Sequence, residues 1–317
     1  MFLKNLKPLC YSIFLLILIM LFTGSSQTRC SKFGIILLDN IFGLDGVGIK
    51  CYDQGLQIRP DKVKKNPDKK RPNVKYYYDT SNKIKKECPI NSNVIVIIGQ
   101  SNAGNSVISK VLQDKNNLNY NPNDNFCYEL SEPVLGAEGN LDSITSSIGK
   151  KLIAKKPILF INRSVSGSRI NQWAEFFAED LNRILKKVLE KNVLNSIVWI
   201  HGESENINTS KEYFKNFKIM NELIFKDLKI KFEDTNFIIT HSTYCKPWNL
   251  DEEKENKKEL DLQRKLINEK WSNIKLLEIT DNLNTSYRYD QCHFNRKGTE
   301  IISDVISKSI NLTLQNN

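Results

Sequence analysis

The stretch VIVIIGQSNAGNS, Val94 to Ser106, decides the fold because it joins a short apolar run to a group of small polar residues. The run Val94–Ile98 has the length and the β-branched content of a buried strand. Gly99 ends this run, and Ser101 follows two residues later. In open parallel sheets, ligands bind at the carboxyl ends of the strands. The stretch therefore predicts a strand that delivers Ser101 to a functional edge.

Apolar runs of the same kind recur along the chain and alternate with longer amphipathic stretches. The predicted strands are Val94–Ile98, Ile158–Ile161, Ile197–Ile200, Phe237–Thr240 and Ile274–Ile279. The predicted helices are Leu141–Lys155, Gln172–Lys191, Lys211–Lys231, Asp251–Trp271 and Lys297–Asn311. This alternation implies parallel strands with crossover helices. The sequence predicts an α/β protein, a three-layer α/β/α sandwich with a central parallel sheet.

Residues 1–26 have the layout of a secretory signal peptide. Lys4 and Lys7 precede an uncharged run from Tyr11 to Thr23, and small residues follow at positions 24–26. The run is short for a membrane span, and an uncleaved signal anchor is the alternative. We expect an exported protein in the periplasm, an endomembrane lumen or the medium, with a membrane tether as the second possibility.

Residues 27–92 are expected to form an N-terminal extension and a basic linker before a main domain at residues 93–317. The chain carries a formal net charge of +10, and segment 61–87 holds ten Lys or Arg residues against four Asp or Glu. Such a segment is typical of a solvated linker. The alternative is contact with an anionic polymer or a membrane surface. Specific nucleic-acid binding is not expected.

The cysteines favour disulfides over a metal site. Six of them lie beyond residue 26: Cys30, Cys51, Cys88, Cys127, Cys245 and Cys292. An even number in an exported chain permits up to three disulfides. None has the close spacing of a zinc or redox site, so no structural metal is expected.

A serine becomes a nucleophile only when a base takes its proton, and the chain has three histidines. His293 lies in RYDQCHFNRKGTEI, three residues after Asp290. This spacing lets the carboxylate reach Nδ1 and leaves Nε2 free for a serine proton. A serine at a strand end is more often a helix cap or a turn residue. Together, the two motifs make Ser101, Asp290 and His293 a candidate triad.

Two further polar segments follow predicted strands. NRSVSGSRINQWAEF supplies Gly167, which lacks a Cβ and can bring its backbone N–H close to an ester. VWIHGESEN runs off the next strand into His201. Because the carboxyl ends of parallel strands meet at one edge, we expect these segments to converge on Ser101.

Four blocks of the sequence resemble those of a known protein family: IIGQSNAGNS, SGSRINQWA, VWIHGESE and YDQCHFNRKG. They resemble the successive blocks of the SGNH hydrolase superfamily, in the branch of sialate O-acetylesterase-like carbohydrate esterases that carry GQSN in place of GDSL. The similarity covers residues 93–310. It implies a three-layer sandwich of flavodoxin-like topology and a serine esterase that removes O-acetyl groups from a carbohydrate. It also implies a covalent acyl-enzyme and no cofactor.

By this resemblance Ser101 is the nucleophile, His293 the general base and then acid, and Asp290 its orienting partner. The backbone N–H groups of Ser101 and Gly167 are expected to bind the oxyanion. His201 stands where relatives usually have glutamine, and a neutral imidazole offers one hydrogen bond in its place.

Five more residues are expected to bind substrate or support the loops: Gln100, Asn102, Arg169, Trp173 and Glu203. Glu203 is expected to hold loop backbone N–H groups, with a second catalytic acid as the alternative. Trp173 either stacks on a sugar or lies in the core, and Arg169 either contacts an anionic group or caps its loop.

The implied fold also brings Cys245 close to Cys292, which predicts a disulfide that fastens the His293 loop; a free thiol pair is the alternative. A rival function remains open at this stage. His201 and the basic segment also fit a non-catalytic protein that binds a glycan or an anionic polymer and keeps the hydrolase fold.

Overall fold

The computed structural model describes residues 47–52, 55–60, 73–111, 113–241, 245 and 250–315. The chain divides into two compact units, Met1–Lys70 and Arg71–Asn317. In the first unit, β1 (Val47–Tyr52) and β2 (Gly55–Pro60) form an antiparallel pair. The expected signal peptide or anchor lies outside the described residues. Among the helices that are described, none is both long and apolar enough to cross a bilayer.

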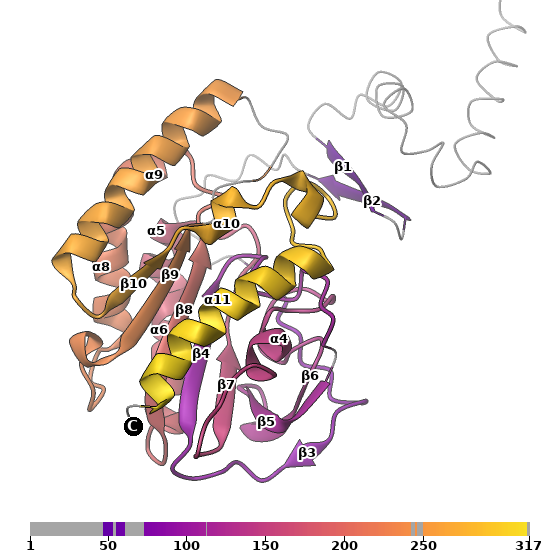
Figure 1. Cartoon of the computed structure of the whole chain (residues 1–317), viewed down its shortest axis with the longest axis vertical. Helices are drawn as coiled ribbons and strands as arrows, with labels where there is room; N and C mark the ends of the chain where they lie inside the picture. Colours follow the sequence, from indigo (N-terminus) through magenta and orange to yellow (C-terminus); the bar gives the residue numbers. More distant parts are fainter. Residues whose placement is uncertain are drawn as a thin grey trace, which may run out of the picture. The chain divides into compact units, whose positions relative to one another are not determined.

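The second unit is built on an eight-stranded sheet with the strand order β10-β9-β8-β4-β7-β5-β6-β3 (Figure 1). Its strands are β3 (Lys85–Lys86), β4 (Asn93–Gly99), β5 (Gln113–Asn121), β6 (Phe126–Ser131), β7 (Ile158–Asn162), β8 (Val193–His201), β9 (Asn236–His241) and β10 (Ile274–Leu277). The strands from β10 to β5 pair in parallel, and β6 and β3 add an antiparallel edge. The predicted central parallel sheet is confirmed.

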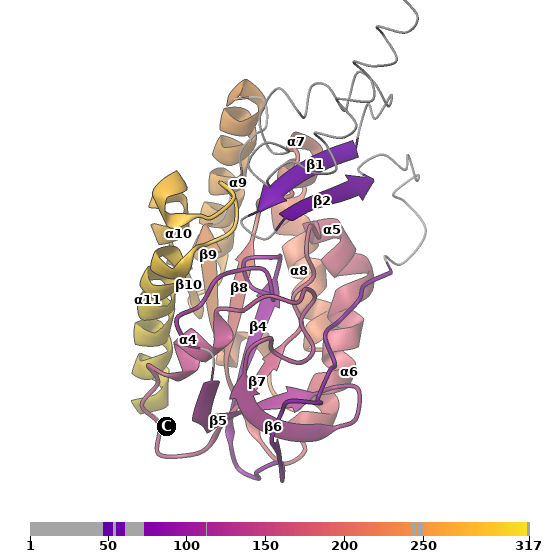
Figure 2. The same cartoon turned by 90° about the vertical axis from the view of Figure 1, so that its right-hand side faces the viewer.

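Helices cover both faces of this sheet, as Figure 2 shows. They are α4 (Thr145–Gly149), α5 (Ile170–Gln172), the π-helical turn η1 (Trp173–Phe177), α6 (Ala178–Val188), α7 (Ile207–Lys211), α8 (Tyr213–Ile224), the 3-10 turn η2 (Phe232–Asp234), α9 (Leu250–Lys270), α10 (Ile279–Asn282), the 3-10 turn η3 (Thr285–Tyr287) and α11 (Arg296–Gln315). Residues of α6, α8 and α9 share one apolar core, and residues of α4 and α11 share the other. The expected three-layer sandwich is confirmed.

The central strand β4 shows why an unbroken apolar run is needed here. Val94, Val96 and Ile98 face the core under α6 and α8, whereas Ile95 and Ile97 face the core under α11. All five side chains are fully buried. Successive side chains of a strand point to opposite faces, so a strand covered on both faces reads as continuous hydrophobic sequence.

The hairpin of β5 and β6 was not predicted, because β5 is a polar strand. Its Asn117, Asn119 and Asn121 are buried. Asn119 accepts the N–H of Leu135 at 2.7 Å and donates to the carbonyl of the same residue at 3.3 Å. Buried amides that find such partners take the place of apolar side chains. A search for hydrophobic alternation therefore passes over this strand.

The predicted helix Leu141–Lys155 is reduced to the five residues of α4. The N–H of Leu141 donates to the carbonyl of Asn105, and the Asp142 carbonyl accepts from Val107. The Asp142 side chain also accepts the N–H of Ser109 at 2.8 Å. These bonds tie the start of the predicted helix to the loop after β4, and helix formation begins only beyond them.

The second unit begins at Arg71, earlier than the expected boundary at residue 93. Tyr77 exchanges backbone hydrogen bonds with Gly136 and Ala137 at 2.9 and 2.7 Å. The Arg163 guanidinium lies 3.3 Å from the centre of the Tyr76 ring and donates to the Tyr78 hydroxyl at 2.8 Å. The three tyrosines thus anchor the chain to the domain. Residues 73–87 are all exposed or half-buried, as expected of a solvated segment, but these contacts tie the tyrosines to the domain.

A disulfide between Cys88 and Cys127 fastens the same segment to β6. The two cysteines are 39 residues apart, and closing a loop of this size is worth about 2–4 kcal/mol of stability. We expect the Cys88→Ser/Cys127→Ser double variant to lose that amount in urea unfolding. Because β7 and β5 separate β6 from β4, the loop that follows β4 should keep its structure. An unchanged unfolding midpoint in the double variant would contradict this assignment.

Candidate active site

The carboxyl ends of β4 and β8 approach each other closely where Ser101 leaves the sheet. Gly99 has φ +129°, and a Cβ at this position would lie 1.9 Å from the carbonyl oxygen of Ile200. The N–H of Gln100 donates to that same carbonyl at 2.9 Å. Only glycine allows this contact, which directs the chain across the end of β8 and presents Ser101 at the edge of the sheet.

Ser101, His293 and Asp290 form one chain of hydrogen bonds. The Ser101 Oγ lies 2.8 Å from Nε2 of His293, and the His293 Nδ1 lies 2.7 Å from Oδ2 of Asp290. The other carboxylate oxygen accepts the N–H groups of His293 at 2.7 Å and Cys292 at 3.0 Å. Ser101 and His293 are 9% and 7% exposed. This geometry can pass the serine proton to the ring.

Asp290 is held in its charged form. Burial raises the pKa of this carboxyl, but the hydrogen bonds and charge of His293, with the two backbone N–H groups, together lower it to about 2. The carboxylate is therefore ionised at neutral pH, where it orients the imidazole and stabilises an imidazolium.

Asn102 ties the serine loop to the histidine loop. Its side-chain oxygen accepts the N–H of Phe294 at 3.0 Å, and its Nδ2 donates to the carbonyl of Cys292 at 3.2 Å and to Glu203 at 2.7 Å. Asn102 is fully buried. The structure thus places both Asn102 and Glu203 in loop-supporting contacts.

Two residues beside the DxxH pair also hold this loop, and sequence reasoning missed both. The buried Arg288 guanidinium donates to the carbonyls of Leu283, Thr280 and Cys292. The Tyr289 ring stacks on His293 with 5.8 Å between centroids, and its hydroxyl donates to the Ser106 carbonyl at 3.0 Å. Their only sequence signal was adjacency to Asp290 in RYDQCH.

The structure contains the expected disulfide between Cys245 and Cys292. It joins the residue that precedes His293 to the chain between β9 and α9. The His293 loop is thus fixed by a covalent link as well as by Asn102 and Arg288.

Gly167 lies in a tight turn next to the end of β4. The N–H of Val165 donates to the Gly99 carbonyl at 2.9 Å, and the N–H of Ser168 closes the turn on Val165 at 3.2 Å. Gly167 has φ +67°, a conformation that this third position of a turn commonly requires. Within the described residues, the N–H groups of Gly167 and Ser101 donate to no protein acceptor.

Gln100 and Arg169 support the loop after β8. The Gln100 amide donates to the Ser204 hydroxyl at 2.6 Å and accepts the N–H of Gly202. The Arg169 Nε donates to the Ser204 carbonyl at 3.1 Å. Both contacts fit the loop-supporting alternative of the sequence analysis.

Trp173 lies in the core and has no surface for a sugar. It is fully buried, and its ring centroid lies 5.0 Å from that of Trp199 and 5.4 Å from that of Phe177. Its indole N–H donates to the Ser168 hydroxyl at 2.9 Å. The sugar-stacking alternative is therefore wrong, and Trp173 supports the Gly167 loop from below.

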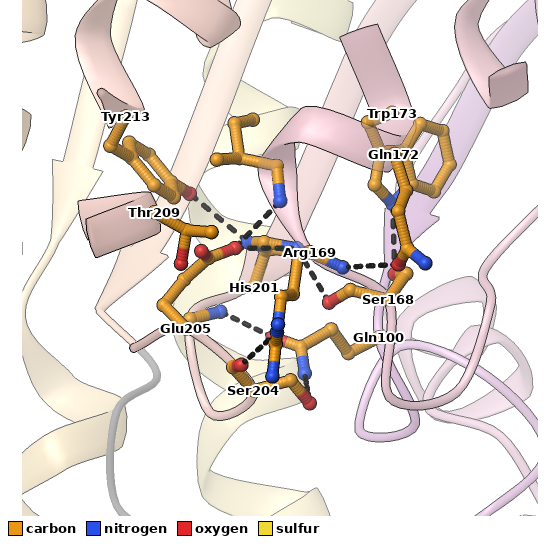
Figure 3. A network of polar contacts seen from close by, with 12 residues as sticks. Gln100, Ser168, Arg169, Gln172, Trp173, His201, Ser204, Glu205, Thr209 and Tyr213 are labelled. Carbon is orange, nitrogen blue, oxygen red and sulfur yellow. Dashed lines mark hydrogen bonds and ion pairs between the residues drawn. The ribbon is translucent and has the colours of Figure 1, made fainter. Parts of the chain in front are cut away.

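The surroundings of His201 rule out the oxyanion contact expected of it. His201 is fully buried, and its Nε2 faces the Ser168 carbonyl at 3.1 Å (Figure 3). Because a neutral imidazole has one N–H, none is left for an oxyanion. The nearby Glu205, which was not among the expected site residues, accepts the N–H of Ile170 at 2.6 Å.

Comparison with solved structures supports the fold. A protein from Arabidopsis thaliana is 15% identical, with a TM-score of 0.53, over 72% of this chain and 99% of its own. NanS is 14% identical, with a TM-score of 0.51, over 72% of this chain and 99% of its own. None of the curated proteins compared with the chain matches it.

The family comparison covers most of the chain. Residues 91–310 match the family described as "Carbohydrate esterase, sialic acid-specific acetylesterase". This range contains the complete Ser101, His293 and Asp290 chain of hydrogen bonds. The chain therefore belongs to the sialic acid-specific acetylesterase family of carbohydrate esterases and is a carboxylic ester hydrolase.

Proposed function

We propose that this esterase removes O-acetyl groups from a carbohydrate through Ser101, His293, Asp290 and a covalent acetyl-enzyme. The observation that carries the proposal is the continuous hydrogen-bond chain from the Ser101 hydroxyl through His293 to the ionised Asp290. The family description, which names a carbohydrate and an acetyl ester, supports the substrate class.

Acylation begins when the Ser101 Oγ attacks the acetyl carbonyl carbon while Nε2 of His293 takes the serine proton. Asp290 stabilises the imidazolium that forms. The carbonyl oxygen becomes negative and accepts hydrogen bonds from the N–H groups of Ser101 and Gly167, which have no protein acceptor of their own among the described residues. The bond to the sugar oxygen then breaks, and His293 returns the proton to that oxygen.

Deacylation repeats the same proton movements with water. His293 takes a proton from a water molecule while the oxygen of that water attacks the acetyl carbon on Ser101. The second tetrahedral intermediate collapses, the proton on His293 returns to the Ser101 Oγ, and acetic acid leaves and ionises to acetate in solvent. Neither step calls for a metal or an organic cofactor.

A fluorophosphonate tests the covalent step, since its phosphorus takes the place of the acyl carbon and fluoride leaves. We expect one adduct per chain by intact mass, and peptide mapping should place it on Ser101. The Ser101→Ala variant and the urea-unfolded parent serve as controls and should stay unlabelled. A parent that hydrolyses acetyl esters without labelling at Ser101 would rule out an acyl-enzyme at this serine.

The substrate class is tested separately with acetate release from O-acetylated sialic acid, other acetylated sugars and p-nitrophenyl esters of increasing chain length. We expect acetyl esters to be cleaved faster than butyryl esters, and acetylated sugars to be cleaved with release of acetate. Faster cleavage of long acyl chains than of acetyl groups would contradict an acetylesterase.

Export of the enzyme is part of the same proposal. Cys88–Cys127 and Cys245–Cys292 support it, because disulfides form and persist in oxidising compartments. The signal peptide that export requires falls on residues 1–26, outside the described residues. Contact of the basic segment with an anionic polymer or a membrane remains a prediction for residues 61–87, of which residues 61–72 lie outside the described residues.

A further inference from the structure

A buried polar network lies beneath the turn that carries Gly167, and the mechanism above leaves it unused. Figure 3 shows His201 at its centre, between Tyr213 on one side and Ser168 on the other. His201 is the last residue of β8, and its ring stacks on Trp199 with 4.4 Å between centroids and 15° between planes. Nothing in this arrangement allows the ring to contact a substrate directly.

The partners of His201 fix its tautomer. The Ser168 carbonyl can only accept a hydrogen bond, so Nε2, at 3.1 Å from it, carries the proton. The bare Nδ1 then accepts from the Tyr213 hydroxyl at 3.3 Å. That hydroxyl is itself oriented by the indole N–H of Trp199, which donates to it at 2.8 Å. The network thus runs from Trp199 through Tyr213 and His201 to the backbone of Ser168.

The ring is also kept neutral. Burial, followed by the nearby positive charge of Arg264, lowers the pKa of His201 well below its usual value. Arg264 is fully buried and donates to the His201 carbonyl at 2.6 Å. Glu205 lies 3.6 Å from Nε2, and burial raises the pKa of this carboxyl to about 7. Because the His201 ring is neutral, it has a single N–H group, at Nε2, and the Ser168 carbonyl is its acceptor.

That acceptor belongs to the turn that holds Gly167. The Ser168 carbonyl is held by His201, its hydroxyl by Trp173, and its N–H by Val165. Two residues further on, Glu205 holds the N–H of Ile170. Gly167 itself is exposed, and a Cβ there would meet nothing within 4 Å. Glu138 also holds the N–H of Ser166 at 2.8 Å, so the turn is fixed through the residues on either side of Gly167 and not through Gly167 itself.

We propose that His201 is a positioning residue of the esterase, which holds the Ser168 carbonyl and so aims the Gly167 N–H at the oxygen of the reacting acetyl group. The inference rests on the proposed function, since it needs an oxyanion at Ser101. A glutamine meets the same requirement, because its amide offers one donor for Ser168 and one acceptor for Tyr213. A phenylalanine keeps the stacking on Trp199 and removes both hydrogen bonds.

The test compares His201→Phe, His201→Gln and Tyr213→Phe with the parent, using kcat and KM for acetate release and the melting temperature. Loss of one oxyanion donor typically lowers kcat about 10²–10³-fold. We expect a decrease of that order in His201→Phe, with KM within about threefold, and recovery of most of kcat in His201→Gln. Tyr213→Phe should lower kcat less, and adding it to His201→Phe should cost nothing more, because the two residues act through one bond.

A folded His201→Phe variant with the kcat of the parent would overturn the proposal and leave His201 as core packing. If His201→Phe does not fold, His201→Gln is the deciding variant. A kcat lowered about 10²–10³-fold in His201→Gln would also overturn the proposal. Fluorophosphonate labelling separates this proposal from the first. Absence of labelling at Ser101 in the parent defeats the proposed function, whereas equal labelling rates in the parent and His201→Phe defeat only the positioning role.

Discussion

The Ser101→Ala variant is expected to lose about 10⁴- to 10⁶-fold in kcat for acetyl ester hydrolysis, the range seen when a hydrolase loses its nucleophile. In the proposed mechanism the Ser101 hydroxyl oxygen attacks the ester, and its proton passes to Nε2 of His293, 2.8 Å away. Acetate release under saturating substrate measures the effect. Circular dichroism and thermal unfolding should be unchanged, since only the Ser101–His293 hydrogen bond is removed.

Ser106→Ala is the matched control. Ser106 lies on the same loop, and its carbonyl accepts from Tyr289, a bond that the substitution leaves in place. Its activity should stay within about twofold of the parent, as is usual for a change away from the reacting groups. Comparable losses in both variants would mean that the loop, rather than the Ser101 hydroxyl, is what the activity requires.

The Asp290→Asn variant should lose about 10⁴-fold in kcat while it keeps the fold. Oδ1 of Asp290 accepts two backbone N–H groups, so the oxygen of an asparagine amide stays on that side. Its NH₂ group then occupies the place of Oδ2 and faces Nδ1 of His293. A ring that accepts at Nδ1 carries its proton on Nε2, which points at Ser101 and can no longer take the serine proton.

Asp304→Asn is the control for this charge removal. Asp304 of α11 pairs with Lys151, and its side chain is 50% exposed. Lys151 keeps its second partner, Glu300, so the substitution should cost little stability, and kcat should be unchanged. Steady-state kinetics at fixed pH compare the two variants. Wild-type activity in Asp290→Asn would show that the carboxylate does not set the tautomer of His293.

The sequence was sufficient to predict the central strand of the sheet and the pairing of His293 with Asp290 at the edge of the sheet. Val94–Ile98 could be read as a strand because it is buried on both faces, and His293 could be linked to Asp290 because three residues separate them. Strand β5 could not be found, since its buried asparagines carry no hydrophobic pattern. Its stability comes from hydrogen bonds to residues distant along the chain.

The support of the site was harder to predict than its reacting groups. Whether His201 meets an ester or a backbone carbonyl depends on which way its ring turns at the end of β8, and Tyr213 and Trp199 decide that. Glu203 and Glu205 lie two residues apart, yet Glu203 accepts from Asn102 and Glu205 accepts from Ile170. Such assignments depend on tertiary contacts, which local spacing does not encode.

The separation of Ser101 and His293 by 192 residues has a consequence for biosynthesis. Ser101 emerges early from the ribosome, whereas its base follows the last strand of the sheet, β10. In the proposed mechanism, a nascent or prematurely terminated chain that ends before residue 293 holds the nucleophile without the group that activates it. Hydrolytic activity should then appear only after translation has passed the histidine, and acetate release should report on chains in which the sheet and the His293 loop are both complete.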